Sequence, residues 1–250
     1  MEEKRLGYID ACKGVGIIFV VLGHILWENP VRSWIYSFHM PLFFFLSGYT
    51  FHYERKAGLW ALTKKRVMTL LVPYFSFAFF FYGYWVLIER HFNPSSAEVS
   101  PEATFYGIFR GVSVEKGLIF DKPLWFLPCL FVAILIFACI LQALRRTILV
   151  ILALFLCVFL GIIARFWASE VRLPWSIDAA LVSLMFVGAG YYMRRTKVIN
   201  NIVNNKIRFV LIVIALPALL GNYLIQFKNT FVDMSQCFYG NCFAFFVAAF

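Results

Sequence analysis

Three ionisable side chains lie within the first apolar stretch of the sequence, residues 8–27: Asp10, Lys13 and His24. At about 100° per residue of an α-helix, His24 falls about 20° from Lys13 and about 40° from Asp10, so the three share one face. His24 would lie roughly 16 Å along the helix from Lys13. Because ionisable groups are costly inside a membrane and mark functional sites there, this face predicts a polar channel.

The imidazole of His24 would supply that channel with a catalytic group. A neutral imidazole takes a proton from a hydroxyl near pH 7, which is the task of a general base. Two plainer interpretations stay open: Asp10 and Lys13 pair at the membrane interface, and His24 is hydrogen-bonded to a neighbouring helix.

A second histidine, His39, stands in the run Phe38-His39-Met40-Pro41. Only residues 28–33 separate the two apolar stretches, so we expect His39 near the start of the second helix. The two imidazoles would then approach each other in the outer third of the bilayer. We take His39 as a residue that supports His24, and count Asp10 with both as candidate catalytic groups.

A basic run, Lys64-Lys65-Arg66, comes directly before the third apolar stretch. It is either an anchor on the cytoplasmic side or a docking site for phosphates, which ammonium and guanidinium groups bind well. The long loop over residues 89–123 includes a stretch, 104–120, that is apolar enough to lie along the interface as a short helix.

The elements that must position these groups are membrane-spanning helices. Hydrophobic residues make up 62% of the 250 residues and charged residues 14%, against about 25% charged in a soluble domain. Apolar stretches of about 17–25 residues span a bilayer as helices. We predict an all-α, polytopic helical bundle of about eight spans, a single domain over 1–250. The spans are at 8–27, 34–51, 67–88, 124–144, 148–166, 175–193, 209–227 and from Phe238 onward.

The distribution of charge predicts the orientation of the bundle. With loops assigned alternately to the two sides, one side holds 15 of the 23 Lys and Arg residues, which makes it cytoplasmic together with the N-terminus. The net charge of +10 follows from the same bias, and we do not interpret it as nucleic-acid binding. The six cysteines show no metal or redox spacing.

Several motifs, in order, are similar to those of membrane-bound acyltransferase family 3. They are Tyr8-Ile9-Asp10-x-x-Lys13-Gly14 with Val20-Val21-Leu22-Gly23-His24, then Phe38-His39-Met40-Pro41-Leu42-Phe43-Phe44-Phe45-Leu46-Ser47-Gly48, then Leu70-Leu71-Val72-Pro73-Tyr74 after basic residues, and Leu124-Trp125-Phe126-Leu127. The resemblance covers the chain from Tyr8 to about Leu130. Where the family often has a further basic residue between Arg66 and Pro73, this chain has Met68 and Thr69. The family usually has about ten spans, so we expect the chain to be truncated at its C-terminus.

The resemblance implies a bacterial inner-membrane enzyme that moves an acyl group, usually acetyl from acetyl-CoA, onto a cell-surface carbohydrate or its precursor. Acyl-CoA would be a co-substrate; no bound cofactor or metal is implied. The family's essential basic residue and histidine match Lys13 and His24. The nucleotide end of the donor would rest on Lys13, Lys65 and Arg66, and Trp125 would offer a platform for the sugar ring.

His24 would act as the base or would carry the acyl group briefly; the sequence leaves both open. It also leaves open a transporter or flippase for a polysaccharide or lipid-linked sugar, although no inverted repeat is visible. The oligomeric state is not predicted.

Overall fold

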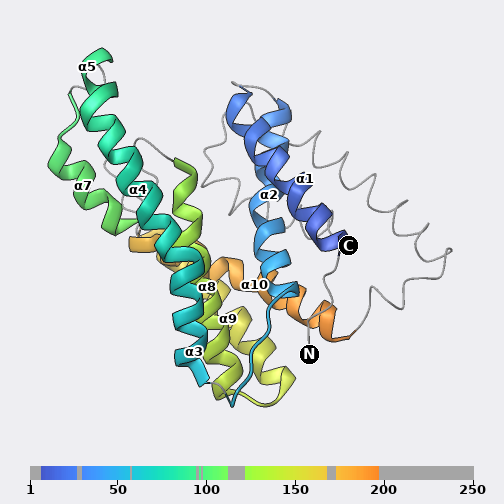
Figure 1. Cartoon of the computed structure of the whole chain (residues 1–250). Coiled ribbons are helices and arrows are strands. Elements are labelled where there is room, and N and C mark those ends of the chain that lie inside the picture. Colours follow the sequence, from blue (N-terminus) through green and yellow to red (C-terminus); the bar gives the residue numbers. More distant parts are fainter. Residues whose placement is uncertain are drawn as a thin grey trace. The chain divides into compact units, whose positions relative to one another are not determined.

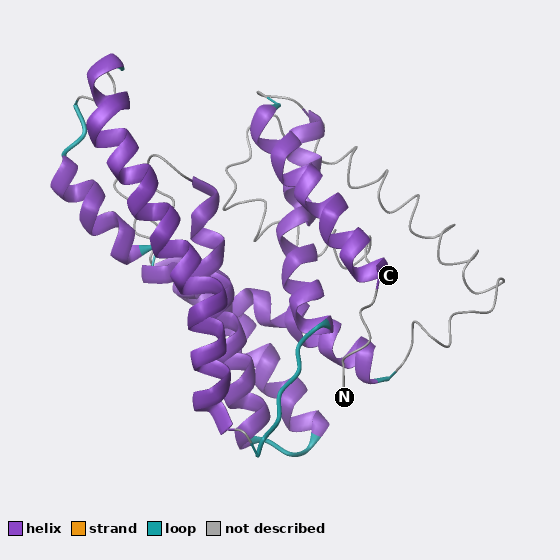
Figure 2. Cartoon of the chain, in the orientation of Figure 1, coloured by secondary structure: helices purple, strands orange, loops and turns teal. Residues whose placement is uncertain are grey.

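The computed structural model describes residues 7–26, 30–56, 58–93, 96, 98–111, 122–167 and 173–196. In these ranges the chain consists of helices and short loops, without a strand (Figure 2). The predicted all-α fold is confirmed. Figure 1 colours the helices along the sequence. They fall into two compact units: residues 1–51 with 186–250, and residues 52–185.

The first unit contains an antiparallel pair of helices, α1 (Gly7–Ile25) and α2 (Pro30–Tyr49). The buried residues of α1 are Ile9, Gly16 and Gly23, seven apart, a spacing that keeps them on one helix face. The two glycines let α2 approach closely. A Cβ at Gly16 would lie 3.0 Å from Phe43, and one at Gly23 would lie 2.7 Å from Tyr36. These contacts fix the register of the pair.

The second half of α10 (Ile177–Arg195) also belongs to the first unit. It crosses α2 where each helix has a glycine, since a Cβ on Gly48 or Gly190 would collide with the backbone of the other helix. Arg194 donates a hydrogen bond to the carbonyl oxygen of Tyr49 at 3.2 Å. The Tyr49 hydroxyl in turn is 2.8 Å from that of Tyr8 and ties the start of α1 to the end of α2.

The second unit is built on one long helical segment, Gly58–Phe92. It comprises α3 (Gly58–Arg66), η1 (Val67–Leu71), α4 (Val72–Tyr84), η2 (Trp85–Glu89) and α5 (Arg90–Phe92). Both η segments are single π-helical turns, which are uncommon and occur frequently at functional sites. At ~1.5 Å per residue the 35 residues extend about 52 Å, more than the ~30 Å hydrocarbon core of a bilayer. The predicted span at 67–88 is therefore only the middle of this helix.

The helix α8 (Phe126–Ala143) follows the short η3 (Lys122–Trp125) and contacts α3, η1, α9 (Thr147–Trp167) and η4 (Pro174–Ser176). The helix α7 (Pro101–Arg110) contacts α4 and η4, and the first half of α10 also belongs to this unit. The expected helix at 104–120 is present in part as α7, which Gly111 ends with a left-handed backbone at φ 60°. Residues 112–120 of the expected helix lie outside the described residues.

Side-chain hydrogen bonds to backbone carbonyls hold the second unit together. The buried hydroxyl of Tyr74 donates to the carbonyl oxygen of Ile108, and Trp175 Nε1 donates to that of Phe109 at 2.8 Å. Arg55 donates to the carbonyl oxygens of Leu141 and Leu144 and so caps the end of α8, where carbonyl groups have no partner within the helix.

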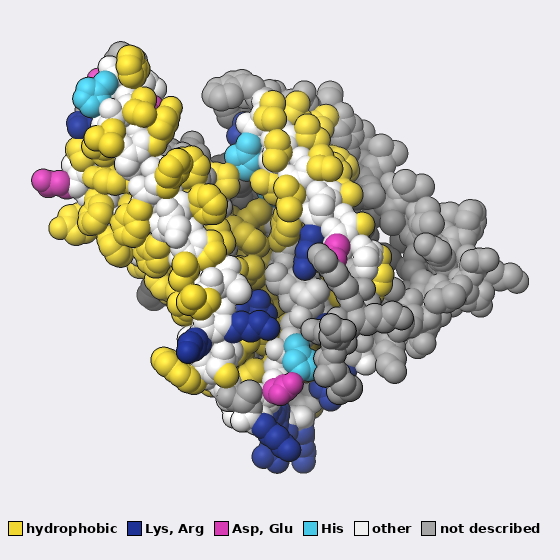
Figure 3. Space-filling view, in the orientation of Figure 1, with side chains coloured by type: hydrophobic (Ala, Val, Ile, Leu, Met, Phe, Trp, Pro, Cys, Tyr) yellow, Lys and Arg dark blue, Asp and Glu magenta, His cyan; other side chains and the backbone are white. Residues whose placement is uncertain are grey.

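Large apolar side chains cover much of the described surface (Figure 3), as the lipid-facing surface of a membrane protein requires. Five described helices are long and apolar enough to span a membrane: Gly7–Ile25, Gly58–Phe92, Pro123–Ala143, Thr147–Ala164 and Pro174–Arg195. The predicted spans at 8–27, 124–144, 148–166 and 175–193 correspond to four of these. The stretch at 34–51 forms α2, which is not among the five, and the last two predicted spans lie outside the described residues.

Candidate functional site

The polar face of α1 borders the seam between α1 and α2. Angles around the helix axis, measured from Ile9, show this. The seam residues Gly16 and Gly23 fall at about −20° and −40°. The polar residues follow on one side of the seam, at about +40° for Lys13, +60° for His24 and +100° for Asp10. Asp10 and His24 are exposed and Lys13 is half-buried. Because α1 is one uninterrupted helix, the alignment of the three side chains expected from the sequence is present.

The ring of His24 is held in one tautomer. Its Nδ1 lies 2.7 Å from the carbonyl oxygen of Val20, one turn earlier in α1. A carbonyl oxygen only accepts hydrogen bonds, so in the neutral ring the proton is on Nδ1 and Nε2 carries the lone pair. Neutral His24 thus presents a nitrogen that can accept a proton on the exposed side of its ring.

His39 lies in the middle of α2, ten residues into the helix, and the expectation that it stands near the helix start is wrong. The helix begins at Pro30, because proline suits the first turn, where its missing N–H costs nothing. His39 is 1% exposed, and its Nδ1 lies 2.8 Å from the carbonyl oxygen of Ile35. Its Nε2 therefore also carries the lone pair in the neutral form. Among the described residues this buried nitrogen has no hydrogen-bond partner.

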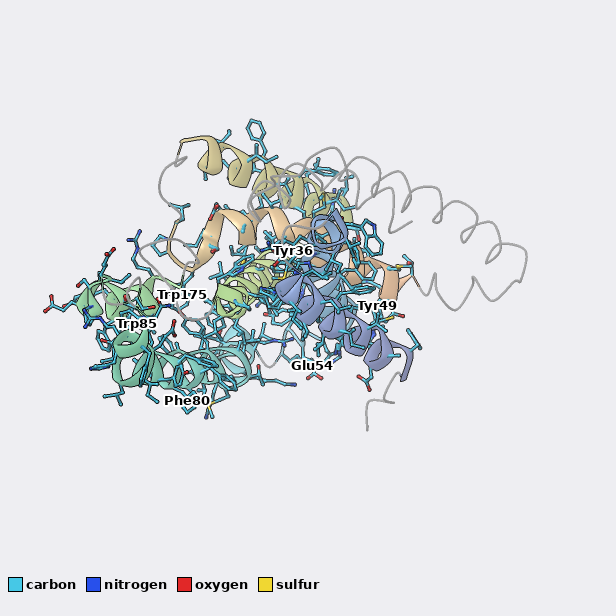
Figure 4. All side chains as sticks on the ribbon, turned by 90° about the horizontal axis from the view of Figure 1, so that it is seen from above. Tyr36, Tyr49, Glu54, Phe80, Trp85 and Trp175 are labelled. Carbon is cyan, nitrogen blue, oxygen red and sulfur yellow. The ribbon has the colours of Figure 1, made fainter. Side chains whose placement is uncertain are left out.

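Tyr36, which the sequence did not single out, lies between the two histidines. Its ring centroid is 5.8 Å from that of His24 and 5.2 Å from that of His39. The ring is 8% exposed and fits against Gly23 at the α1–α2 seam; Figure 4 labels it. Both imidazoles therefore lie beside the same phenol ring, and a direct approach of the two to each other stays a prediction. Only the spacing of Tyr36 and His39, three residues apart on one helix, could have signalled this contact.

Arg32 is the second residue that the sequence analysis missed. Its guanidinium carbon lies 5.1 Å from the centre of the Tyr36 ring, within the range of a cation–π interaction. On α2, Tyr36 is four residues after Arg32 and three before His39, so one face of the helix carries all three.

Lys65 and Arg66 end α3 of the second unit; they are part of a helix and do not precede one. Lysine and arginine are good helix formers, so the helix continues through the basic run. Lys65 is exposed, whereas Arg66 is half-buried, and its buried Nε has no partner among the described residues. Arg66 is thus the member of the pair with a free donor inside the protein, which suits it to an anionic ligand.

Trp125 ends η3 in the second unit and is 6% exposed. Its use as a platform for a sugar stays a prediction. Within the described ranges, no group of three His, Cys, Asp or Glu side chains is arranged to hold a metal ion.

Comparison with known proteins extends the resemblance along the chain. The sequence profile of an acyltransferase domain matches residues 6–250. Nodulation protein NolL of Sinorhizobium fredii (strain NBRC 101917 / NGR234) is 47% identical over an alignment of 51 residues, which covers 16% of this chain and 14% of that protein. The chain thus matches only a small part of that relative's length. No solved structure matches the chain.

Proposed function

Because the chain belongs to the acyltransferase domain family and its helices are those of a membrane protein, we propose that it is an O-acyltransferase acting on carbohydrate. The donor is acyl-CoA, acetyl-CoA in the first instance, and the acceptor is a hydroxyl of a cell-surface carbohydrate or its precursor. The protein lies in a bacterial inner membrane with its N-terminus in the cytoplasm. The excess of Lys and Arg on the side of the N-terminus supports that orientation.

The observation that supports the proposal best is the tautomer of the His24 ring. Its Nδ1 is engaged with the carbonyl oxygen of Val20, which leaves Nε2 as the basic nitrogen. A general base needs this fixed tautomer, since the second nitrogen must be held for the first to face the substrate. Lys13 on the same helix face adds a cation toward the start of α1, where an anionic donor would approach.

In the transfer step, Nε2 of His24 takes the proton of the acceptor hydroxyl as the oxygen attacks the thioester carbonyl carbon. The C–O bond forms, the C–S bond breaks, and the CoA thiolate leaves with the proton that His24 returns. Alternatively Nε2 itself attacks the thioester carbonyl carbon, the C–S bond breaks and the CoA thiolate leaves. In a second step the acceptor hydroxyl oxygen attacks the acyl carbon, the C–N bond breaks, and the hydroxyl proton passes through Nε2 to the thiolate. His39, whose buried Nε2 has no hydrogen-bond partner in the described part of the chain, supports His24 in either route.

The donor's phosphates are anions, and Lys65 and Arg66 of the second unit are proposed to bind them. Arg66 is the stronger candidate of the two, because its buried Nε has no partner among the described residues and a guanidinium binds phosphate through paired N–H groups.

Purified protein incubated with acetyl-CoA labelled in the acetyl group tests the function. We expect label to move to a carbohydrate fraction prepared from the source membranes, or the thioester to be hydrolysed slowly when no acceptor is present. Mass spectrometry of the labelled fraction identifies the acceptor. Binding or movement of carbohydrate with neither transfer nor hydrolysis would favour a transporter.

A further inference from the structure

The group around Tyr36 has more polar atoms than the proposed catalytic step uses. The guanidinium of Arg32 lies on the ring, and the imidazoles of His24 and His39 lie beside it. The distances of 5.1 Å and 5.8 Å from the ring centre limit the separation between Arg32 Cζ and the centre of the His24 ring to about 11 Å. One or two sugar rings can reach from one group to the other.

Two of these side chains each have one buried nitrogen atom without a hydrogen-bond partner among the described residues. Nε of Arg32 and Nε2 of His39 are enclosed in protein, and neither makes a hydrogen bond within the described part of the chain. No described carboxylate pairs with Arg32 either. A buried donor or acceptor without a partner costs free energy, so such atoms commonly mark a place where a ligand binds.

The guanidinium itself selects the kind of ligand. Arginine stays charged at any physiological pH, has only donor groups, and matches carboxylate and phosphate oxygens through paired N–H groups. Its contact with the Tyr36 ring restricts the guanidinium, which reduces the entropy lost when an anion binds. Arg32 also belongs to the side of the bundle opposite the basic one, where the other Lys and Arg residues are few.

We infer that Arg32 is a specificity-determining residue that binds an anionic group on the acyl acceptor, a sugar carboxylate or a phosphate, and so presents a hydroxyl to His24. This inference rests on the proposed acyltransferase function and adds the charge of its acceptor. Tyr36 is a positioning residue that keeps the guanidinium and the imidazole at a fixed separation.

Donor-free binding of three soluble probes tests this: propyl glucoside, propyl glucuronide and the propyl phosphodiester of glucose. Affinities are measured by calorimetry on the purified full chain. The wild type should bind at least one anionic probe about 10-fold or more tightly than the neutral one, as expected for a charge-assisted hydrogen-bonded pair. Preference for the glucuronide indicates a sugar carboxylate, and preference for the phosphodiester indicates a phosphate-linked acceptor.

The Arg32→Gln variant should lose this preference, and Arg32→Lys should retain part of it because the charge remains. Arg90→Gln is the matched control, since Arg90 lies 5.8 Å from the ring centre of buried Trp85 in the second unit; it should bind the probes as the wild type does. Elution profiles in detergent establish that each variant is folded.

Equal affinity for the three probes, including no measurable binding of any, would overturn the inference. So would an unchanged preference in Arg32→Gln, which would leave Arg32 as an anchor to lipid headgroups. The proposed function is judged separately by acyl transfer. If the protein transfers acyl groups but binds charged and neutral probes equally, only the role of Arg32 is refuted. If it prefers an anionic probe but transfers no acyl group, only the proposed acyltransferase function is refuted.

Discussion

Gly23→Ala tests whether close packing at the α1–α2 seam sets the geometry of the candidate site. The added Cβ would lie 2.7 Å from Cε1 of Tyr36 and 3.3 Å from Cγ2 of Ile35. An ordinary contact begins at 3.4 Å, so the Tyr36 ring would have to withdraw by about 0.7 Å. That ring lies beside both His24 and His39, so we expect its displacement to shift their rings.

Two effects of this displacement are measurable. Overpacking of a buried site typically costs about 1–3 kcal/mol of stability. A displacement approaching 1 Å at a catalytic group costs up to about 100-fold in rate, and we expect a loss of about 10- to 100-fold in acyl transfer. The assay is transfer of labelled acetyl from acetyl-CoA by purified variants, with the folded fraction determined by elution profile before and after heating.

Gly14→Ala is the matched control in the same helix. A Cβ at Gly14 meets nothing within 4 Å, and alanine in a helix is more favourable than glycine by about 0.5–1 kcal/mol. Gly14→Ala should therefore keep its activity and be at least as stable as the wild type. If Gly23→Ala and Gly14→Ala were equally active and equally stable, the argument that the Tyr36 contact positions the histidines would be refuted.

Three further predictions concern donor binding and orientation. Lys13→Ala should lower transfer more than Lys13→Arg, which keeps the charge; equal losses would mean that charge is not what matters there. Arg66→Gln should raise the Michaelis constant for acetyl-CoA several-fold more than Lys65→Gln does, because Lys65 is exposed whereas the buried Nε of Arg66 has no partner among the described residues; a larger effect of Lys65→Gln would indicate that Arg66 serves as a membrane anchor. Cysteine at exposed Lys56 should be labelled only from the cytoplasm and cysteine at Glu102 only from outside; the opposite pattern would reverse the topology.

The sequence was sufficient for features that depend on one helix at a time. The face shared by Lys13 and His24 followed from helical periodicity, and α1 is continuous over both residues. The all-α class followed from the apolar stretches. The position of His39 along its helix was predicted incorrectly because residues 30–33 were interpreted as a loop, whereas they form the first turn of α2.

Contacts between helices could not be predicted in the same way. The position of Tyr36 between two imidazoles depends on the register of α1 against α2, which Gly16 and Gly23 set through side chains from the other helix. The extent of the helix around Lys65 was also missed, since a basic run was taken as a boundary although its residues favour helix.

The central claim is that Nε2 of His24 receives the proton of the acceptor or carries the acyl group. The most direct measurement compares acyl transfer by His24→Ala with that by His52→Ala, an exposed histidine paired with Glu54 at 3.1 Å. Loss of a positioned general base typically costs about 10²–10⁴-fold in rate. We predict a loss of that size for His24→Ala with normal expression and elution, and unchanged transfer for His52→Ala. Transfer near the wild-type rate by folded His24→Ala would contradict the account and leave His24 as a packing histidine of α1.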